Sequence, residues 1–326
     1  MNRKFSWTAS VTALYVILIL AVHPIIYQDY YFNILNVKYL FYCACTIGML
    51  ILLGGYFIFT GAFKRIKLKL IPTDYAFLAF IVIATLSAAF SDFKYEAFWG
   101  NEGRYTGLFT MSLYVFSYFF ISRFLKWKQW YLDAFLGGGI LACLWGITDY
   151  FRMDIFHFKE RIASNADSFT SSFGNINTYT IYVAMVIAVA AALFVTFRSV
   201  KRSVYYYICF VIGMFAIIMG ESDNAYLSLG ILFALLPIYT FTKGQAVWRY
   251  AVLTATIFTI ARCIEWINVT YAGTVIGINS LFSFLSGHDK IMTMIVASWA
   301  VAAALYLLKF AVKKEPKAVL LGLRIG

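Results

Sequence analysis

The sequence has little charge for its length. Only 13% of its 326 residues are charged, whereas 62% are hydrophobic. Soluble domains usually carry about a quarter charged residues, so this composition excludes an ordinary soluble protein. The sequence also has no phosphate-binding glycine loop, no dinucleotide-binding glycine pattern and no zinc-ligand spacing. We therefore expect no nucleotide chemistry, no metal site and no cofactor.

Cysteine and proline are scarce as well. All five cysteines lie in apolar stretches, and Cys43 and Cys45 have no histidine or further cysteine nearby in the sequence. This placement favours a packing role over metal binding. The four prolines do not form a matched pair of interrupted apolar segments, the pattern that many secondary transporters show.

Long apolar stretches make up most of the chain. A helix needs roughly 20 apolar residues to cross the hydrocarbon core, and periodic strand patterns are missing. The sequence therefore predicts an all-α, polytopic transmembrane bundle in one domain over 1–326. The ten expected spans are about 8–27, 38–62, 74–90, 105–122, 130–150, 177–197, 204–220, 225–242, 250–268 and 291–311.

The basic residues predict an orientation. With these spans, 19 of the 27 Lys and Arg residues fall on the side of the termini, and 12 of the 15 acidic residues fall on the other side. By the positive-inside rule both termini, including the tail 312–326, are cytoplasmic. The net charge of +12 is then a signal of topology, and we do not expect nucleic-acid binding.

The polar side chains gather in the outer loops. Loops 91–104, 151–176 and 269–290 are longer than a connection needs, and a short fourth one reads GESDNAY from Gly220 to Tyr226. The cytoplasmic loops are short and basic. Any chemistry is therefore expected at the outer face, where cytoplasmic nucleotide-sugars and ATP are absent. A substrate that brings its own leaving group is favoured.

One outer segment, AFWGNEGRYTGLF from Ala97 to Phe109, sets Glu102 and Arg104 before an apolar span. A helix N-terminus attracts anions, and a guanidinium binds phosphate oxygens at two points. Gly103 and Gly107 would let another helix or a lipid headgroup approach the backbone. The segment predicts a diphosphate site. The alternative is an interfacial arginine that extends to headgroups and pairs with Glu102.

Other charges lie near the expected outer side. Arg262 and Glu265 are one turn apart in the ninth span, which favours a pair that faces a cavity. Lys159, Arg161 and Asp167 either line the same region as substrate-binding groups or form a solvated face, and the second interpretation is favoured.

Three segments resemble one family. FWGNEGRYTGLF is similar to the segment of O-antigen ligases and O-antigen polymerases in which an outer loop leads to Arg and then Gly-Leu. SFGNINTYTIYV, with Asn175 and Asn177, resembles the Gly-Asn-x-Asn element of that family, and GESDNAYLSLG, with Asp223, resembles its Ser-rich outer turn. The resemblance covers residues 75–245, and the three segments occur in the family's order.

The resemblance implies a function. Family members are outer-facing membrane glycosyltransferases that need no metal. They pass a sugar chain from undecaprenyl diphosphate to a lipid or glycan acceptor, in the bacterial cytoplasmic membrane. Arg104 would contact the diphosphate, with Glu102, Arg161, Arg262 and Glu265 as further substrate-binding candidates. Asn175 and Asn177 would bind sugar or phosphate oxygens, or they would simply cap a helix.

The catalytic base is expected late in the chain. The family places a histidine in a long outer loop, and His288 is the late histidine here, although the residue eight positions on is Val296 and not glycine. Imidazole accepts a proton near neutral pH, and Asp223 or Asp289 are the alternatives. The acceptor half of the family pattern is thus shortened or divergent.

Two other classes remain open. A transporter or flippase for a lipid or anionic solute would also place arginines near a cavity between helices. A catalytically inactive, truncated relative of the family would bind a lipid-linked glycan without transferring it. The sugar repeat and the choice between ligation and polymerisation do not follow from the sequence.

Overall fold

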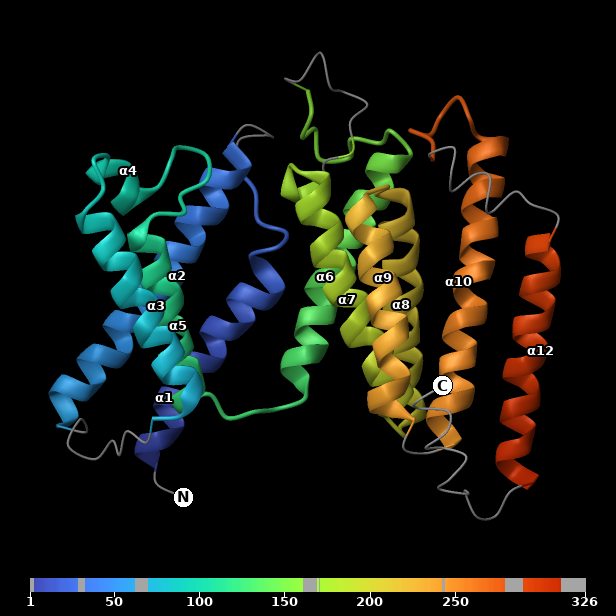
Figure 1. Cartoon of the computed structure of the whole chain (residues 1–326), viewed down its shortest axis with the longest axis horizontal. Helices are drawn as coiled ribbons and strands as arrows, with labels where there is room; N and C mark the ends of the chain where they lie inside the picture. Colours follow the sequence, from blue (N-terminus) through green and yellow to red (C-terminus); the bar gives the residue numbers. More distant parts are fainter. Residues whose placement is uncertain are drawn as a thin grey trace. The chain divides into compact units, whose positions relative to one another are not determined.

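The computed structural model describes residues 3–28, 33–61, 70–160, 169, 171–241, 244–278 and 290–311. The secondary structure of these residues is helical, and no strand occurs among them. The chain forms two compact units, Met1–Phe135 and Leu136–Gly326. Figure 1 shows the helices with their labels, and each unit is described by itself.

The first unit is built from antiparallel helices. Its elements are α1 (Arg3–Ile17), continued by a π-helical turn, η1 (Leu18–Val22), then α2 (Ile34–Thr60), α3 (Pro72–Ala89), the short α4 (Lys94–Trp99), α5 (Leu108–Phe124) and the start of α6 (Trp130–Tyr150). Because successive helices reverse direction, the segment between α3 and α5 lies at the end of this unit opposite to its N-terminus (Figure 1).

Three helices of the first unit meet at a buried polar node. The Tyr15 hydroxyl of α1 lies 2.8 Å from Ser117 Oγ of α5 and 3.2 Å from Thr46 Oγ1 of α2. Beside this node, Leu53 and Phe57 belong to a buried apolar cluster of α1 and α2. Hydrogen bonds between helices are worth about 1 kcal/mol in membranes, so the node adds to packing as the force that joins α1, α2 and α5.

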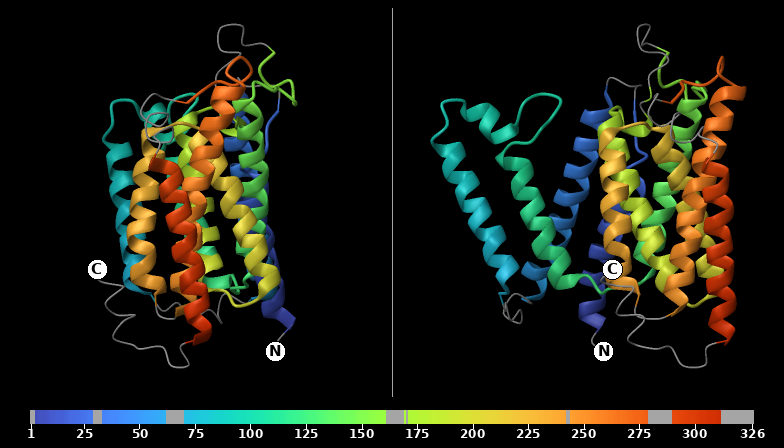
Figure 2. Two further views of the ribbon diagram at one scale, coloured as in Figure 1. Left: turned by 90° about the vertical axis from the view of Figure 1, so that its right-hand side faces the viewer. Right: turned by 45° about the vertical axis from the view of Figure 1, so that its right-hand side comes forward.

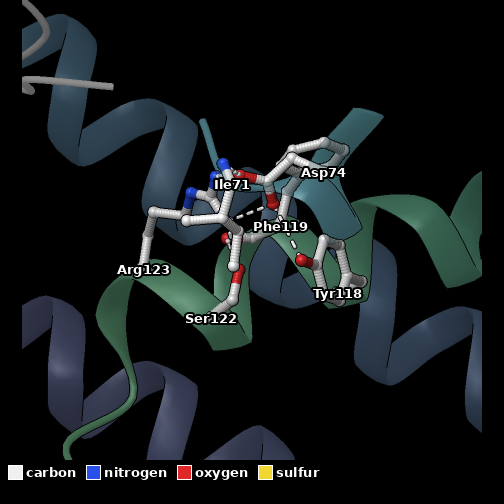
Figure 3. Close-up of polar contacts among 6 residues, drawn as sticks. All are labelled: Ile71, Asp74, Tyr118, Phe119, Ser122 and Arg123. Carbon is white, nitrogen blue, oxygen red and sulfur yellow. Dashed lines mark hydrogen bonds and ion pairs between the residues drawn. The ribbon is translucent and has the colours of Figure 1, made fainter. Parts of the chain in front are cut away.

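A buried ion pair fixes α3 against α5 (Figure 3). The Asp74 side chain is fully buried and accepts hydrogen bonds from both terminal nitrogens of Arg123, at 2.9 and 2.5 Å. The Tyr118 hydroxyl donates to the same carboxylate at 2.8 Å, and the Ile71 N–H donates at 2.8 Å. With four donors the carboxylate is well satisfied, which a buried charge requires.

In the second unit the described residues form the remainder of α6 and six further helical elements. They are the 3-10 turn η4 (Ser171–Phe173), α7 (Ile176–Thr196), α8 (Val200–Met219), α9 (Asp223–Thr240), α10 (Gly244–Thr270) and α12 (Lys290–Ala311). Helices α7, α8 and α9 lie side by side, and α10 and α12 form a pair (Figures 1 and 2).

Helix α7 is the centre of the second unit. More of α7 is buried than of any other span, at 61% of its most apolar window. Gly139 of α6 and Gly213 of α8 face Val186 and Ile187 of α7, where an added Cβ would come within 2.6 and 2.8 Å of those side chains. Small residues let membrane helices approach closely, as expected for the glycine run in α6.

The C-terminus of α7 is capped by a buried arginine. The Arg249 side chain of α10 is 6% exposed and donates from one nitrogen to the carbonyl oxygens of Phe194 and Phe197. The last carbonyl groups of a helix have no partner within the helix, and cations are stabilising there. This contact ties α10 to α7.

The expected spans coincide with helices. Seven described helices are long and apolar enough to cross a membrane, by length and composition: those beginning at Ile34, Pro72, Trp130, Ile176, Val200, Gln245 and Ile291. The other three expected spans correspond to shorter apolar helices, Trp7–Val22, Leu108–Phe124 and Asp223–Ile238. The chain is thus an all-helical, multi-pass membrane protein, and the prediction of one domain stays a prediction.

Candidate functional site

The segment that carries Arg104 is a closed loop between α4 and α5. The Asn101 carbonyl accepts hydrogen bonds from the N–H groups of Arg104 and Tyr105, each at 3.0 Å, which makes a turn. Gly107 lies so close to the backbone of Gly100 that a Cβ on either residue would overlap it. The prediction that Gly107 admits a helix or a headgroup is therefore wrong, because its contact closes the loop itself.

Gly103 does not make a close contact either. It has a φ of +80° and nothing within 4 Å of the position that a Cβ would occupy. The left-handed backbone conformation explains why this position is glycine, because residues with a side chain rarely adopt it. No described helix approaches Gly103, and the expected approach of a lipid headgroup there stays a prediction.

Arg104 is exposed in this loop. Helix α5 begins at Leu108 and not at 105 as predicted, so three residues separate the guanidinium from the helix. Among the described residues Arg104 makes no ion pair with Glu102, which overturns that part of the alternative interpretation. The arginine is thus available to an external anion, while its approach to the α5 N-terminus is looser than expected.

Glu102 has a different environment from Arg104. Glu102 lines a cavity of about 630 Å³ within the first unit, together with aromatic residues of α2, α4 and α5. Arg104 is not among the residues that line this cavity. The two neighbouring charges that the sequence groups into one site therefore face different surroundings.

The structure brings together two of the three family-like segments in the second unit. Asn175 is the N-cap of α7, and its Oδ1 accepts the Thr178 N–H at 3.1 Å, so the capping interpretation is confirmed for this residue. Asn177 Oδ1 accepts the Ser222 hydroxyl at 2.8 Å. This hydrogen bond joins residues 45 positions apart and holds the N-termini of α7 and α9 side by side.

Asp223 is the first residue of α9 and is exposed. A carboxylate in the first turn of a helix is stabilised by the positive end of the helix dipole, by about 0.3–1 kcal/mol. Its position beside Ser222 and Asn177 keeps it in the same polar surface as the predicted substrate-binding asparagines. Its carboxylate makes no hydrogen bond or ion pair with a described side chain.

The sequence analysis missed Glu221, the residue before Ser222. Glu221 has a φ of 49°, a left-handed conformation that is uncommon for a residue other than glycine. Its Oε1 is buried and has no hydrogen-bond partner among the described residues. Burial raises the pKa of Glu221 from its ordinary value of 4.5 to about 7. The Tyr150 side chain lies within electrostatic range of this carboxyl group.

Strained backbone and unsatisfied buried groups are concentrated at functional sites. A carboxyl group with a pKa near neutrality is suited to exchange protons, as general bases and proton carriers do. The sequence feature that could have indicated Glu221 is the GESDNAY turn, in which the resemblance drew attention to Asp223 instead. Burial of the carboxyl group could not be inferred from that turn.

The ion pair expected in α10 forms, and the cavity that it was expected to face stays a prediction. Arg262 donates to Glu265 from one terminal nitrogen, and the two side chains are 40% and 10% exposed. Residues three apart on a helix share a face, so this contact follows from spacing alone. Neither side chain lines the cavity of about 630 Å³ in the first unit or the one of about 490 Å³ between α10 and α12.

The solvated-face prediction is wrong for Lys159, because this residue is buried and paired. Its side chain is 5% exposed and pairs with Asp149 Oδ1 at 3.0 Å, while Asp149 Oδ2 accepts the Ser171 N–H at 2.5 Å. Asp149 lies near the end of α6, so these two contacts fasten Lys159 and Ser171 to that helix. Lys159 is structural because a buried pair leaves it no free charge.

Several predicted residues lie outside the described residues. These are Arg161, Asp167, His288 and Asp289, so their predicted roles stay predictions. Among the described residues, no group of three or more His, Cys, Asp or Glu side chains could hold a metal ion. Arg104 belongs to the first unit, whereas Asn175, Asn177, Glu221, Asp223, Arg262 and Glu265 belong to the second.

Comparison with known proteins gives no assignment. The chain matches no protein-family model, no curated protein and no solved structure at a significant level. What the helices define is a class: an all-helical, multi-pass membrane protein. Among the described residues, its polar features at the ends of helices are a loop with an exposed arginine in one unit and, in the other, a surface of two joined helix N-termini beside a half-buried carboxyl group.

Proposed function

We propose that this protein transfers a glycan from an undecaprenyl-diphosphate carrier to a lipid or glycan acceptor at the outer face of the cytoplasmic membrane. The proposal includes ten spanning helices, cytoplasmic termini and a bacterial setting. It rests on the resemblance to O-antigen ligases and polymerases over 75–245. Neither a metal nor a cofactor takes part in it.

One observation carries the proposal. The Ser222 hydroxyl donates to Asn177 Oδ1, so two of the three family-like segments meet at the N-termini of α7 and α9. Two neighbouring helix N-termini offer N–H donors and positive dipole ends to an anionic or oxygen-rich ligand. Beside them lies Glu221, a carboxyl group able to take up a proton near neutral pH.

Each residue has a role in the proposed reaction. Arg104 is assigned to the diphosphate by the resemblance alone, and the carrier diphosphate leaves the anomeric carbon as the new glycosidic bond forms. Asn177 and Asp223 position sugar or acceptor hydroxyl groups. Glu221 takes the proton from the acceptor hydroxyl as its oxygen attacks the anomeric carbon. Glu221 is thus a second candidate for the base beside His288, which lies outside the described residues.

A second function is favoured by the same carboxyl group. Buried carboxyl groups in membrane proteins often carry protons in transporters, because burial brings their pKa near neutrality. A proton-coupled transporter for a lipid or anionic solute would use Glu221 in this way. Glu221 does not favour the inactive relative, since a carboxyl group with one buried oxygen that lacks a partner among the described residues is costly to keep without a use.

Reconstitution separates these functions. Purified protein in proteoliposomes receives a synthetic undecaprenyl-diphosphate glycan and an acceptor lipid, and both the joined product and proton flux are measured. Transfer predicts product with wild-type protein, loss of at least about tenfold with Arg104→Ala, and partial activity with Arg104→Lys, which keeps charge but not two-point geometry. Lys94→Ala, another cation of the same outer segment, is the matched control.

The opposite outcomes are equally clear. Solute-dependent proton flux without product, abolished by Glu221→Gln, would establish transport. Absence of both with folded protein would leave the inactive relative. In cells, lipid-linked donor should accumulate and surface glycan should be lost both without the protein and with Arg104→Ala; unchanged pools in cells lacking the protein would contradict transfer.

A further inference from the structure

The first unit contains a cavity that the proposed reaction does not use. It measures about 630 Å³, within the size range of small-molecule sites. Three of its walls are helices, α2, α4 and α5, and the fourth is the loop that closes at Gly100. Its lining includes five aromatic rings and one carboxylate: Tyr39, Tyr95, Trp99, Tyr105, Phe109 and Glu102.

The chemistry of this lining selects the sign of a ligand's charge. The faces of aromatic rings carry partial negative charge and attract cations, most strongly when the cation is weakly hydrated. Glu102 is the charged residue among those that line the cavity, and it adds a full negative charge. The aromatic rings and Glu102 therefore repel phosphate and carboxylate ligands, and both attract a small organic cation.

The walls are held in place without a ligand. Tyr39 of α2 stacks on Tyr105 with ring centroids 4.3 Å apart and planes within 10°. Trp99 packs against Phe109 at 5.1 Å. Tyr105 has a φ of 51°, and its carbonyl accepts the Thr110 hydroxyl at 2.6 Å. A preorganised site loses less entropy on binding, and strained residues of this kind are concentrated at ligand sites.

A belt of interfacial aromatics is the simpler explanation for rings at this level of a membrane protein. Such a belt consists of rings that anchor singly in the headgroup region, and the exposed Tyr95, at 71%, suits it. A belt does not require rings from α2, α4 and α5 to border one half-open pocket that also holds a carboxylate. Aromatic rings and a carboxylate that converge on one pocket are the groups that recognise substituted ammonium groups.

We infer that this cavity binds an organic ammonium group. Two sources share this chemistry: the headgroup of a zwitterionic lipid, and a soluble amine such as choline or an amino sugar. For a lipid, Arg104 outside the cavity is two residues from Glu102, so a phosphate beside the bound ammonium would have a cation near it. The inference is independent of glycan transfer, because no donor is needed for binding.

The first arm of the experiment uses soluble ligands. The full-length protein is placed in nanodiscs of phosphatidylglycerol only, which offer no ammonium headgroup, and binding is measured by saturation-transfer NMR. Choline is compared with 3,3-dimethylbutan-1-ol, its neutral isostere, and glucosamine is compared with N-acetylglucosamine. We expect each cation to bind at least about tenfold more tightly than its neutral partner.

The second arm tests the lipid source. The protein is reconstituted with equal amounts of phosphatidylethanolamine and phosphatidylglycerol, and the lipids that stay bound are counted by native mass spectrometry. Selective retention of phosphatidylethanolamine identifies a lipid headgroup as the occupant. Binding of choline or glucosamine without such retention identifies a soluble amine.

Variants connect either result to the cavity. Glu102→Gln is exposed and nearly isosteric, so it should fold normally and weaken cation binding about tenfold. Glu96→Gln removes a carboxylate of the neighbouring α4 that does not line the cavity, and it should bind like wild type. Equal binding of neutral and cationic ligands, no binding in either arm, or an unaffected Glu102→Gln variant would each overturn the inference.

Discussion

Glu221 illustrates how one residue can depart from the rules that the rest of the chain follows. Its backbone is left-handed, and one carboxylate oxygen is buried without a hydrogen-bond partner among the described residues. Each of these features lowers stability by roughly 1–3 kcal/mol in typical proteins. A group kept at that cost is a strong candidate for function, whichever of the proposed activities proves correct.

The raised pKa of Glu221 predicts how stability changes with pH. Because the folded-state pKa of about 7 exceeds the ordinary 4.5, folding favours the protonated carboxyl group. This contribution is fully present below about pH 4.5 and is lost as the pH rises through 7. Glu221→Gln mimics the protonated form. Its melting temperature should therefore equal that of wild type near pH 5 and exceed it at pH 8, by on the order of 1–2 °C.

Asp223→Asn is the matched control for that measurement. It removes an exposed carboxylate two residues away, and the difference from wild type should not grow with pH over the same range. A constant difference between Glu221→Gln and wild type from pH 5 to pH 8 would contradict the prediction.

The Asp74–Arg123 pair gives a second prediction at this scale. Asp74→Ala leaves Arg123 without its buried partner, and removing one member of such a pair costs about 3–5 kcal/mol. The double variant Asp74→Leu, Arg123→Leu removes both charges and should recover most of the loss. Thermal unfolding in detergent measures both variants. Equal losses for the single and double variants would show that shape, and not charge, holds α3 on α5.

Residue contacts were predictable from the sequence only where they are local. The Arg262–Glu265 pair and the Asn175 cap follow from a spacing of three residues. Asp74 and Arg123 are 49 residues apart, so no local spacing connects them. Lys159 was predicted to lie on a solvated face because the residues near it in the sequence do not indicate Asp149 as its partner. Such contacts depend on which helices pack together, and composition does not determine that.

Among the elements, the loop between α4 and α5 depends most on one residue type. Gly107→Ala would place a methyl group against the backbone of Gly100, and backbone cannot move aside as a side chain can. We expect a loss of about 1–3 kcal/mol and a weaker ammonium site, because the loop forms one cavity wall. Gly48→Ala in α2, with nothing within 4 Å, is the control and should be neutral or slightly stabilising.

The measurements are unfolding temperature and choline binding for both glycine variants. A Gly107→Ala protein that matches Gly48→Ala in both would show that the loop tolerates a different closure.

Helix positions followed well from hydrophobicity, and helix ends did not. All ten apolar stretches coincide with helices, since roughly 20 apolar residues leave few other structures possible in lipid. The fourth span was placed from 105, whereas α5 begins at Leu108, because Asn101 and Tyr105 form a turn first. The short α4 was not predicted, as its six residues are too few for a periodic signal.

For the whole molecule, the proposed orientation is directly testable. Asp92→Cys lies in a segment expected outside, and Lys201→Cys lies at the start of α8, expected inside. In a Cys263→Ser background, which removes the exposed native thiol, a membrane-impermeant maleimide should label Asp92→Cys in intact cells. Lys201→Cys should react only after permeabilisation. The reverse pattern would invert the topology and place the Arg104 loop in the cytoplasm.

The pair that joins α3 to α5 also bears on biogenesis. A carboxylate and a guanidinium each make partition of a single helix from the translocon into lipid less favourable, by about 2.5–3.5 kcal/mol at mid-membrane and less near an end. Asp74 and Arg123 can offset this only when both helices are present. α3 should therefore remain beside the translocon until α5 has been synthesised, and the two helices should enter the bilayer together as one hairpin.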